Sequence, residues 1–164
     1  MTHKEKAEQL LHQKYHCSQA LFGAFASDFG MDLKTAFKIS TCFGGGMRQG
    51  GVCGCITGSL LVLGMALGFF DPQDTERETY GNQKTDEFIR RFTQAMDGVT
   101  RCRDILGQDI SKAEGMAAIR REGLILQKCP RAINISIEIL EDMLADYLKD
   151  VTQSDLELKD IPQD

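Results

Sequence analysis

The sequence predicts a single all-α domain, a helical bundle around one buried, glycine-rich helix at about residues 52–70. Apolar residues recur at spacings of three and four along most of the chain, and sustained strand-like alternation is absent. The 164 residues, 42% of them hydrophobic and 26% charged, suit one globular domain of ordinary size. No internal repeat and no linker rich in proline or serine divides the chain.

The first third of the chain is expected to form a helical hairpin from three amphipathic segments. The apolar residues that define these segments are Leu10, Leu11 and Tyr15, then Leu21, Phe22, Phe25 and Phe29, then Leu33, Ala36, Phe37 and Ile39. Gly30 is typical of a helix C-terminus and Asp32 of the next N-cap. A tight turn is therefore expected between the second and third segments.

The segment from Val52 to Phe70 carries no charge and is long enough to be considered as a membrane span. Four glycines, two cysteines, a threonine and a serine make it less apolar than a typical span. Small residues at every fourth position suit close helix packing, and the surrounding amphipathic helices need a shared apolar partner. We therefore interpret the segment as the central helix and do not expect a membrane protein.

Helical spacing returns at Thr85 to Met96 and at Pro130 to Leu148, with a shorter helix from Ala113 to Arg121. The end of the chain is acidic, because nine acidic residues and two lysines lie between Glu138 and Asp164. We place one domain at residues 1–150 and an acidic tail, expected to be mobile, at residues 151–164.

Charge and cysteine content limit the possible functions. The net charge of -5 lacks the basicity that nucleic-acid binding requires, so nucleic acid is not an expected partner. The first residues are charged and helix-patterned, with no apolar secretory region, so a cytoplasmic location is expected. A reducing cytosol keeps thiols unpaired, which directs the six cysteines toward metal binding, transient redox chemistry or packing.

The most unusual stretch runs from residue 44 to 51 with the sequence Gly-Gly-Gly-Met-Arg-Gln-Gly-Gly. Glycines allow positive φ and can turn successive N–H groups into one concavity. The residues expected to bind an anion or stabilise a thiolate there are Gly44, Gly45, Gly46, Arg48, Gly50 and Gly51. The alternative is a sharp turn between packed helices. The stretch is neither a Walker loop, since no Gly-Lys-Ser/Thr follows, nor a dinucleotide fingerprint, since it follows a helix.

Cys53 is the candidate for the reactive sulfur, because it is expected in the first turn of the central helix, where the helix dipole lowers a thiol pKa. On a regular helix Cys55 points about 200° away from Cys53 and shares no site with it. If Val52 to Gly54 are loop instead, the two cysteines form a Cys-X-Cys pair.

Cations adjoin two later cysteines, since Cys102 lies between Arg101 and Arg103 and Cys129 follows Lys128. Positive charge stabilises a thiolate, and it equally balances a four-thiolate iron–sulfur cluster.

The remaining cysteines and histidines carry weaker signals. Cys17 follows His16 at the start of the second helix, and Cys42 is expected to lie apart as a buried structural thiol. His3 and His12 are expected to face solvent, and no Cys-His-Asp set supports acyl transfer.

Five short motifs occur in a set order over nearly the whole chain: Cys17-Ser-Gln-Ala, Phe43-Gly-Gly-Gly-Met, Cys53-Gly-Cys-Ile-Thr-Gly58, Arg101-Cys-Arg-Asp-Ile-Leu106 and Cys129-Pro. This ordered set resembles the redox-active C_GCAxxG_C_C family. The family's CGAxxG motif and four cysteines correspond to Cys17, Cys53, Cys102 and Cys129, while Cys55 stands where the motif has alanine. The resemblance implies a bacterial or archaeal helical protein with a redox role, and it implies that the four thiols converge.

Three functions are consistent with these residues. The first is thiol–disulfide exchange with a small thiol or a redox partner protein, in which Cys53 attacks, Cys102 or Cys129 resolves and Cys17 lies close by. In the second, the same four cysteines bind an iron–sulfur cluster or zinc. The third is a helical assembly module with structural cysteines, dimerising through the central helix.

Overall fold

The computed structural model describes residues 1–151. Apart from one isolated β-bridge, the regular secondary structure in this range is helical, which confirms the all-α prediction. Of the tail predicted at residues 151–164, all but residue 151 lie outside the described residues. In the described part, the α-helices are α1 (His3–His12), α2 (Cys17–Phe25), α3 (Leu33–Ser40), α4 (Gly54–Leu67), α5 (Thr75–Ala95), α6 (Cys102–Leu106), α7 (Ala113–Glu122) and α8 (Leu124–Met143).

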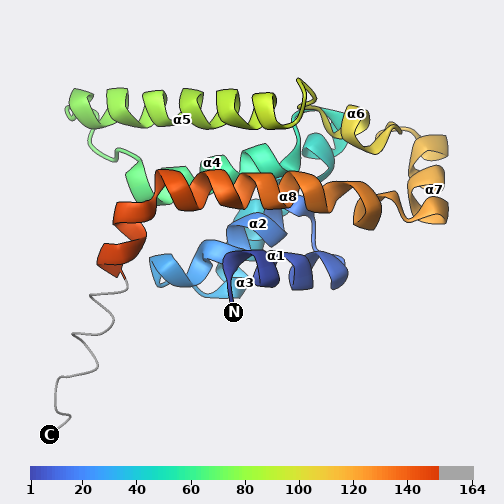
Figure 1. Cartoon of the computed structure of the whole chain (residues 1–164), viewed down its shortest axis with the longest axis horizontal. Helices are drawn as coiled ribbons and strands as arrows, with labels where there is room; N and C mark the ends of the chain where they lie inside the picture. Colours follow the sequence, from blue (N-terminus) through green and yellow to red (C-terminus); the bar gives the residue numbers. More distant parts are fainter. Residues whose placement is uncertain (152–164) are drawn as a thin grey trace, which may run out of the picture.

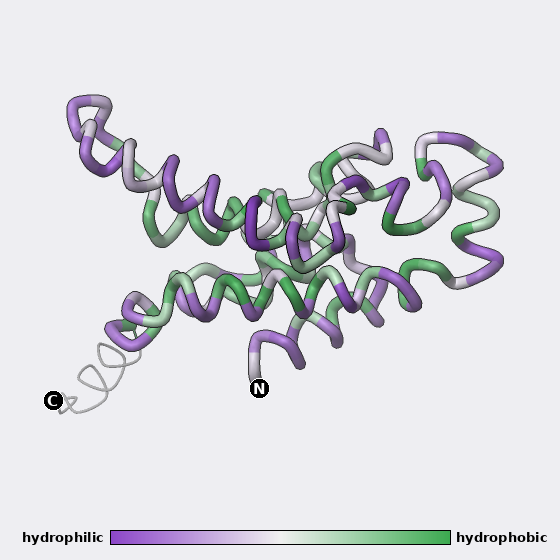
Figure 2. The backbone as a smooth tube through the Cα atoms, turned by 45° about the horizontal axis from the view of Figure 1, so that its top comes forward, coloured by the Kyte–Doolittle hydropathy of each residue, from purple (hydrophilic) through white to green (hydrophobic). Residues whose placement is uncertain are grey.

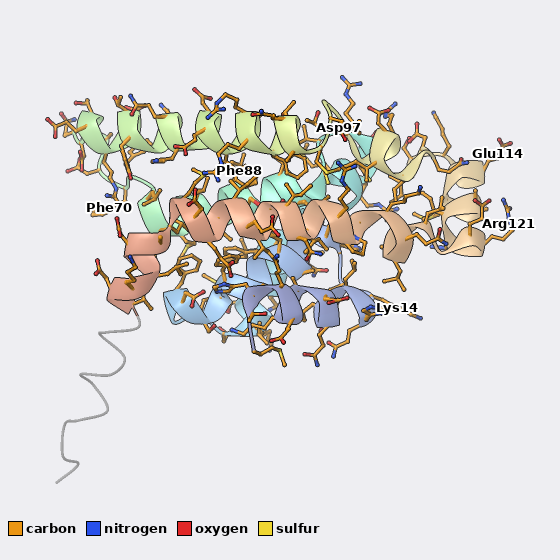
Figure 3. The ribbon with its side chains drawn as sticks, viewed as in Figure 1. Lys14, Phe70, Phe88, Asp97, Glu114 and Arg121 are labelled. Carbon is orange, nitrogen blue, oxygen red and sulfur yellow. The ribbon has the colours of Figure 1, made fainter. Side chains whose placement is uncertain are left out.

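The helix α4 is the centre of the bundle, as predicted. It packs against α2, α5 and α8, while α1 and α3 cover the far side of α2 (Figure 1). The short helices α6 and α7 lie together at one end of the long helices. In Figure 2, hydrophobic stretches gather where the helices meet, and hydrophilic residues dominate the periphery, as along α5. The fully buried aromatic side chains Phe22, Phe25, Phe88 and Phe92 form much of this core, and Phe88 points inward in Figure 3.

The central helix is shorter than the predicted segment at residues 52–70. Cys53 is its N-cap and Gly68 its C-cap, and the next residues, Phe69 and Phe70, are exposed at the end of the molecule opposite α7 (Figure 3). Within residues 1–151, no helix combines the length and the hydropathy that crossing a bilayer would require.

Two of the glycines of α4 bring the starts of α2 and α4 together. A Cβ atom built on Gly58 would lie 3.0 Å from the Ser18 carbonyl oxygen, and one on Gly54 would lie 3.2 Å from the Ser18 amide nitrogen. The close helix approach expected from the small residues is therefore made here within the chain. Its consequence is that Cys17, the first residue of α2, is held beside the first turn of α4.

The two long helices begin earlier than their apolar spacing predicted. The first ten residues of α5 are almost all polar, so its start is marked only by the N-cap residue. The Asp74 side chain accepts a hydrogen bond from the Arg77 amide. Pro130, taken as the start of the last helix, instead lies inside α8, which begins at Leu124 directly after the left-handed Gly123. Such a position costs one backbone hydrogen bond but leaves the helix continuous.

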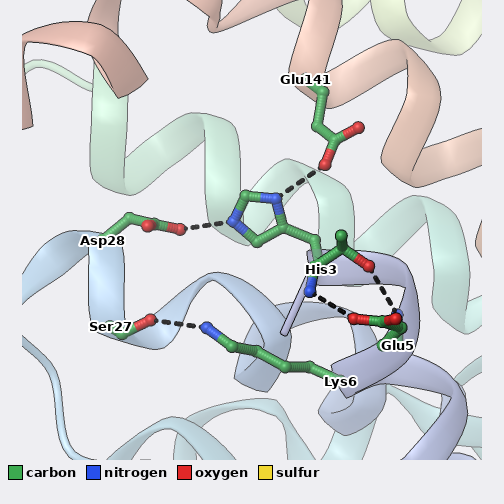
Figure 4. Close-up of polar contacts among 7 residues, drawn as sticks. His3, Glu5, Lys6, Ser27, Asp28 and Glu141 are labelled. Carbon is green, nitrogen blue, oxygen red and sulfur yellow. Dashed lines mark hydrogen bonds and ion pairs between the residues drawn. The ribbon is translucent and has the colours of Figure 1, made fainter. Parts of the chain in front are cut away.

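His3 does not face solvent, contrary to expectation. Its ring stacks on Phe25 at a centroid distance of 3.9 Å, and its two nitrogens lie 2.8 Å from the carboxylates of Asp28 and Glu141 (Figure 4). Burial opposes the charged imidazolium, but hydrogen bonds to both carboxylates outweigh it, and the pKa of His3 is raised above 6.5. One side chain thus ties α1 to the turn after α2 and to α8.

We expect this contact to make folding stability depend on pH. Because the pKa of His3 is higher in the folded chain, its contribution is complete below about 6.5, the pKa of a free histidine, and is lost as pH rises through the raised value. Replacing His3 with glutamine should remove this decline and cost about 1–3 kcal/mol between about pH 5 and 6.5, where carboxylates are ionised and the imidazole is protonated. Urea unfolding at several pH values measures it. His12→Gln is the control, because within residues 1–151 no carboxylate forms an ion pair with His12. An identical change in both variants would contradict the prediction.

Candidate functional site

Four cysteines that are far apart in sequence line one cavity of about 460 Å³. They are Cys17, Cys53, Cys102 and Cys129, the same four that the motifs singled out. Cys17 begins α2, Cys53 caps α4, Cys102 begins α6 and Cys129 lies in the second turn of α8. The ends of α1 and α7 and part of the glycine-rich loop complete the walls.

A capping arrangement fixes Cys17. The backbone N–H of His16 donates to the Gln19 side chain at 3.0 Å, and the His16 ring nitrogen Nδ1 donates to the Thr41 carbonyl at 3.0 Å. Gln19 in turn donates to the Phe37 carbonyl and to the Thr41 hydroxyl. These bonds tie the start of α2 to the end of α3 and leave the Cys17 side chain partly exposed in the cavity.

Backbone hydrogen bonds hold the segments of Cys53 and Cys102 together. Cys53 N–H donates to the Thr100 carbonyl at 2.9 Å, and Cys102 N–H donates to the Gly51 carbonyl at 2.7 Å, on either side of a bridge between Val52 and Arg101. Cys53 is extended, with φ -56° and ψ 136°. Cys53 therefore precedes the helix. The sequence had predicted that it lies in the first turn.

The extended conformation of Cys53 changes the position of Cys55. The Cys55 amide donates to the Cys53 sulfur at 3.4 Å. Hydrogen bonding of the buried Cys55 thiol with Cys17 and Cys53 raises its pKa. Of the two arrangements considered for Cys53 and Cys55, the regular helix through both residues does not occur, because α4 begins only at Gly54. The signal was present in the sequence: Gly54, between two cysteines, is where the loop becomes the helix.

Hydrogen bonding separates the roles of these thiols. The Cys17 sulfur accepts hydrogen bonds from the thiols of Cys129 and Cys55, which hold its pKa well below the usual value. The same bonds raise the pKa of Cys55 and of Cys129, since each must keep its proton to donate. Burial raises the pKa of Cys102 to about 12. The cluster therefore favours one thiolate, at Cys17, among protonated neighbours.

Two arginines near the later cysteines, Arg103 and Arg131, bond to other groups of the chain. Arg103 donates to the carbonyls of Gly50 and Gln49, and Arg131 donates to the carbonyl of Ala95 and the carboxylate of Asp97. These guanidinium groups brace the backbone. The nearby imidazole of His16 also lowers the pKa of Cys17, by less than the thiol hydrogen bonds do.

The glycine-rich loop contains a left-handed turn. Gly45, Gly46, Met47 and Arg48 all have φ between 55° and 64°, which strains the two residues that carry side chains. Three of its predicted anion-binding residues, Gly44, Gly45 and Arg48, line the cavity. The other three, Gly46, Gly50 and Gly51, do not line it; Gly46 packs so closely on Gly51 that a Cβ would lie 2.4 Å from the Gly51 nitrogen.

Cys42 is exposed and does not line the cavity, so the expectation of a buried thiol was wrong. All six cysteines are free. Over residues 1–151, the structure contains no group of three or more His, Cys, Asp or Glu side chains arranged to hold a metal ion.

Comparison with known proteins gives one match. The family described as "Putative redox-active protein (C_GCAxxG_C_C)" matches the chain over residues 15–143. This range includes the four cysteines that line the cavity. No curated protein and no solved structure matches the chain.

Proposed function

The chain belongs to the redox-active C_GCAxxG_C_C family, and from this we propose that it exchanges thiols and disulfides at the cavity, with Cys17 as the attacking sulfur and Cys129 as its resolving partner. The observation that carries the proposal is that Cys17 of α2 and Cys129 of α8 line the same cavity, where a hydrogen bond from the Cys129 thiol lowers the pKa of Cys17. The sequence had assigned attack to Cys53. The hydrogen bonding favours Cys17 instead, which is also the most exposed of the four cavity cysteines.

The reaction would proceed in two balanced steps. The Cys17 thiolate attacks one sulfur of a bound disulfide, forming a Cys17 mixed disulfide and releasing one thiolate, which takes up the proton of Cys129. The Cys129 thiolate then attacks the Cys17 sulfur, closes a Cys17–Cys129 disulfide and releases the second thiolate, which is protonated by water. Starting from the Cys17 thiolate, the protein loses two electrons and the one proton of Cys129; with the proton taken from water, the disulfide becomes two thiols. A reducing compartment such as the cytoplasm would restore the protein thiols.

The first test identifies the bond that forms. Brief treatment of the reduced protein with one equivalent of a small disulfide should give a Cys17–Cys129 disulfide, identified by peptide mass spectrometry without reduction. In the Cys129→Ser variant the reaction should stop at the mixed disulfide on Cys17, because the resolving sulfur is missing. Cys42→Ser is the matched control, since Cys42 is exposed but lies outside the cavity, and it should react like the unaltered chain. Oxidation that leaves Cys17 reduced would refute the proposal.

A second candidate rests on the ligand count alone: four cysteines line one cavity, the number that an iron–sulfur cluster or zinc takes, and binding would require their side chains in residues 1–151 to move into a ligating arrangement. In this candidate Cys17, Cys53, Cys102 and Cys129 would be the ligands. Metal analysis and visible absorption of anaerobically purified protein separate it from disulfide exchange. Stoichiometric iron or zinc that is lost in the Cys17→Ser variant would favour the metal.

A further inference from the structure

The charges around the cavity differ from those of the chain as a whole. The chain has 24 acidic residues against 19 lysines and arginines, yet among the residues that the structure describes no Asp or Glu lines the cavity. Its charged lining consists of Lys14, Arg48 and Arg120, accompanied by His12 and His16. In an acidic protein, this is a local concentration of positive charge.

The three cations are not used to hold the fold together. Within residues 1–151, the side chains of Lys14, Arg48 and Arg120 make neither an ion pair nor a hydrogen bond, unlike Arg103 and Arg131 near the same thiols. All three are exposed at the mouth of the cavity, and Figure 3 shows Lys14 at the end of the molecule where α7 lies.

Two of these cations are also held by unusual backbone. Lys14 and Arg48 have φ of 69° and 63°, and the described residues contain only two other non-glycine residues with positive φ, Met47 and Asp97. Left-handed backbone costs about 1–2 kcal/mol for a residue with a side chain. Such strain concentrates at functional sites, and here it fixes the backbone from which cationic side chains reach the cavity.

Much of the rest of the cavity lining is apolar. The residues that form it are Leu11, Ile105, Leu106, Ile110, Met116 and Ile119, together with the more exposed Ile125 and Leu126. The volume of about 460 Å³ is typical of a site for a small molecule. Cys53, Cys102 and Cys129 are only 4%, 8% and 5% exposed, so Cys17 is the cavity cysteine that an entering disulfide reaches first.

We propose that the substrate is a small organic disulfide that carries an anionic group, a carboxylate or a phosphate, separated from its sulfur by an apolar chain. This inference rests on the proposed exchange function and adds the charge and size of the partner. The sulfur would lie against Cys17, the apolar chain along the aliphatic walls, and the anion among Lys14, Arg48 and Arg120. Oxidation follows the two steps already described, with this disulfide as the oxidant.

The experiment uses three disulfides of similar length and different charge: dithiodipropionate, which is anionic, dithiodiethanol, which is neutral, and cystamine, which is cationic. Rate constants for oxidation of Cys17 are each divided by the rate constant for the same disulfide with mercaptoethanol, which removes intrinsic reactivity. The corrected ratio of dithiodipropionate to cystamine should be about tenfold at low ionic strength and should fall as salt is added.

The variants identify the cations responsible. Replacing Lys14, Arg48 and Arg120 together with glutamine should bring the corrected ratio to about one, and Arg48→Lys should keep it. Arg90→Gln is the control, since Arg90 is exposed on α5 and does not line the cavity. A change in the reactivity of Cys17 itself affects all three disulfides alike and cancels in the ratio.

The possible results separate the two proposals. Equal corrected rates for the three disulfides, or a preference that the triple variant retains, would overturn the anionic substrate and leave disulfide exchange intact. Failure of Cys17 to react with any of them would overturn the exchange function and this inference with it. A carboxylate is distinguished from a phosphate by repeating the measurement with the disulfide of mercaptoethyl phosphate.

Discussion

Replacing Cys129 with alanine should raise the pKa of Cys17, because the first of its two thiol donors is lost. A higher pKa lowers the fraction of thiolate below that pKa, and the greater nucleophilicity of a more basic thiolate recovers only part of the loss. The alkylation rate of Cys17 in mildly acidic solution should therefore fall, by a factor on the order of ten. Iodoacetamide labelling of Cys17 against pH, followed by mass spectrometry, measures both the rate and the midpoint.

The Cys129→Ser variant tests whether hydrogen bonding is the cause. A serine hydroxyl can donate to the Cys17 sulfur as the thiol does, so its pH profile should stay close to that of the unaltered chain. Loss of the low midpoint in both variants would mean that Cys129 acts on Cys17 through packing. An ordinary midpoint in the unaltered chain would contradict the lowered pKa itself.

The sequence predicted the features that depend on neighbouring residues. Helical spacing located the main helices, and Gly30 and Asp32 marked the turn between the second and third segments. Apolar residues at helical spacing mark a helix face that packs against the core. The first ten residues of α5 lack this spacing, so the start of α5 was missed. The buried residues of α5, Phe88 and Phe92, lie in its second half and anchor the helix to the core.

Features that depend on distant residues could not be read from spacing. The two carboxylates that bind His3 lie 25 and 138 positions away, so nothing beside His3 marks it as buried. Cys55 joins the cluster because Cys53 is extended, and Cys53 is extended because Thr100 accepts its backbone N–H. The motifs indicated which cysteines form the site. The identity of the thiolate depends on hydrogen bonds between thiols from α2, α4 and α8.

The glycine-rich loop offers the largest expected change in stability. Gly46 has φ of 59°, and a Cβ there would lie 2.4 Å from the Gly51 nitrogen and 2.6 Å from its oxygen. Gly46→Ala therefore combines left-handed strain with a backbone clash that no side chain can relieve, and we expect a loss of about 2–4 kcal/mol in the free energy of unfolding. Thermal or urea unfolding provides the measurement.

Two other glycines separate strain from clash. Gly30 has φ of 61° with no atom near the added Cβ, so Gly30→Ala should cost about 1 kcal/mol from strain alone. Gly64 lies in α4 with open space around it and no positive φ, so Gly64→Ala should stabilise the chain by about 0.5–1 kcal/mol. The order Gly64, Gly30, Gly46, from gain to greatest loss, is the expected result. A Gly46→Ala variant no less stable than Gly30→Ala would show that the loop can move away from Gly51, and the left-handed turn that carries Arg48 to the cavity would then not be rigid.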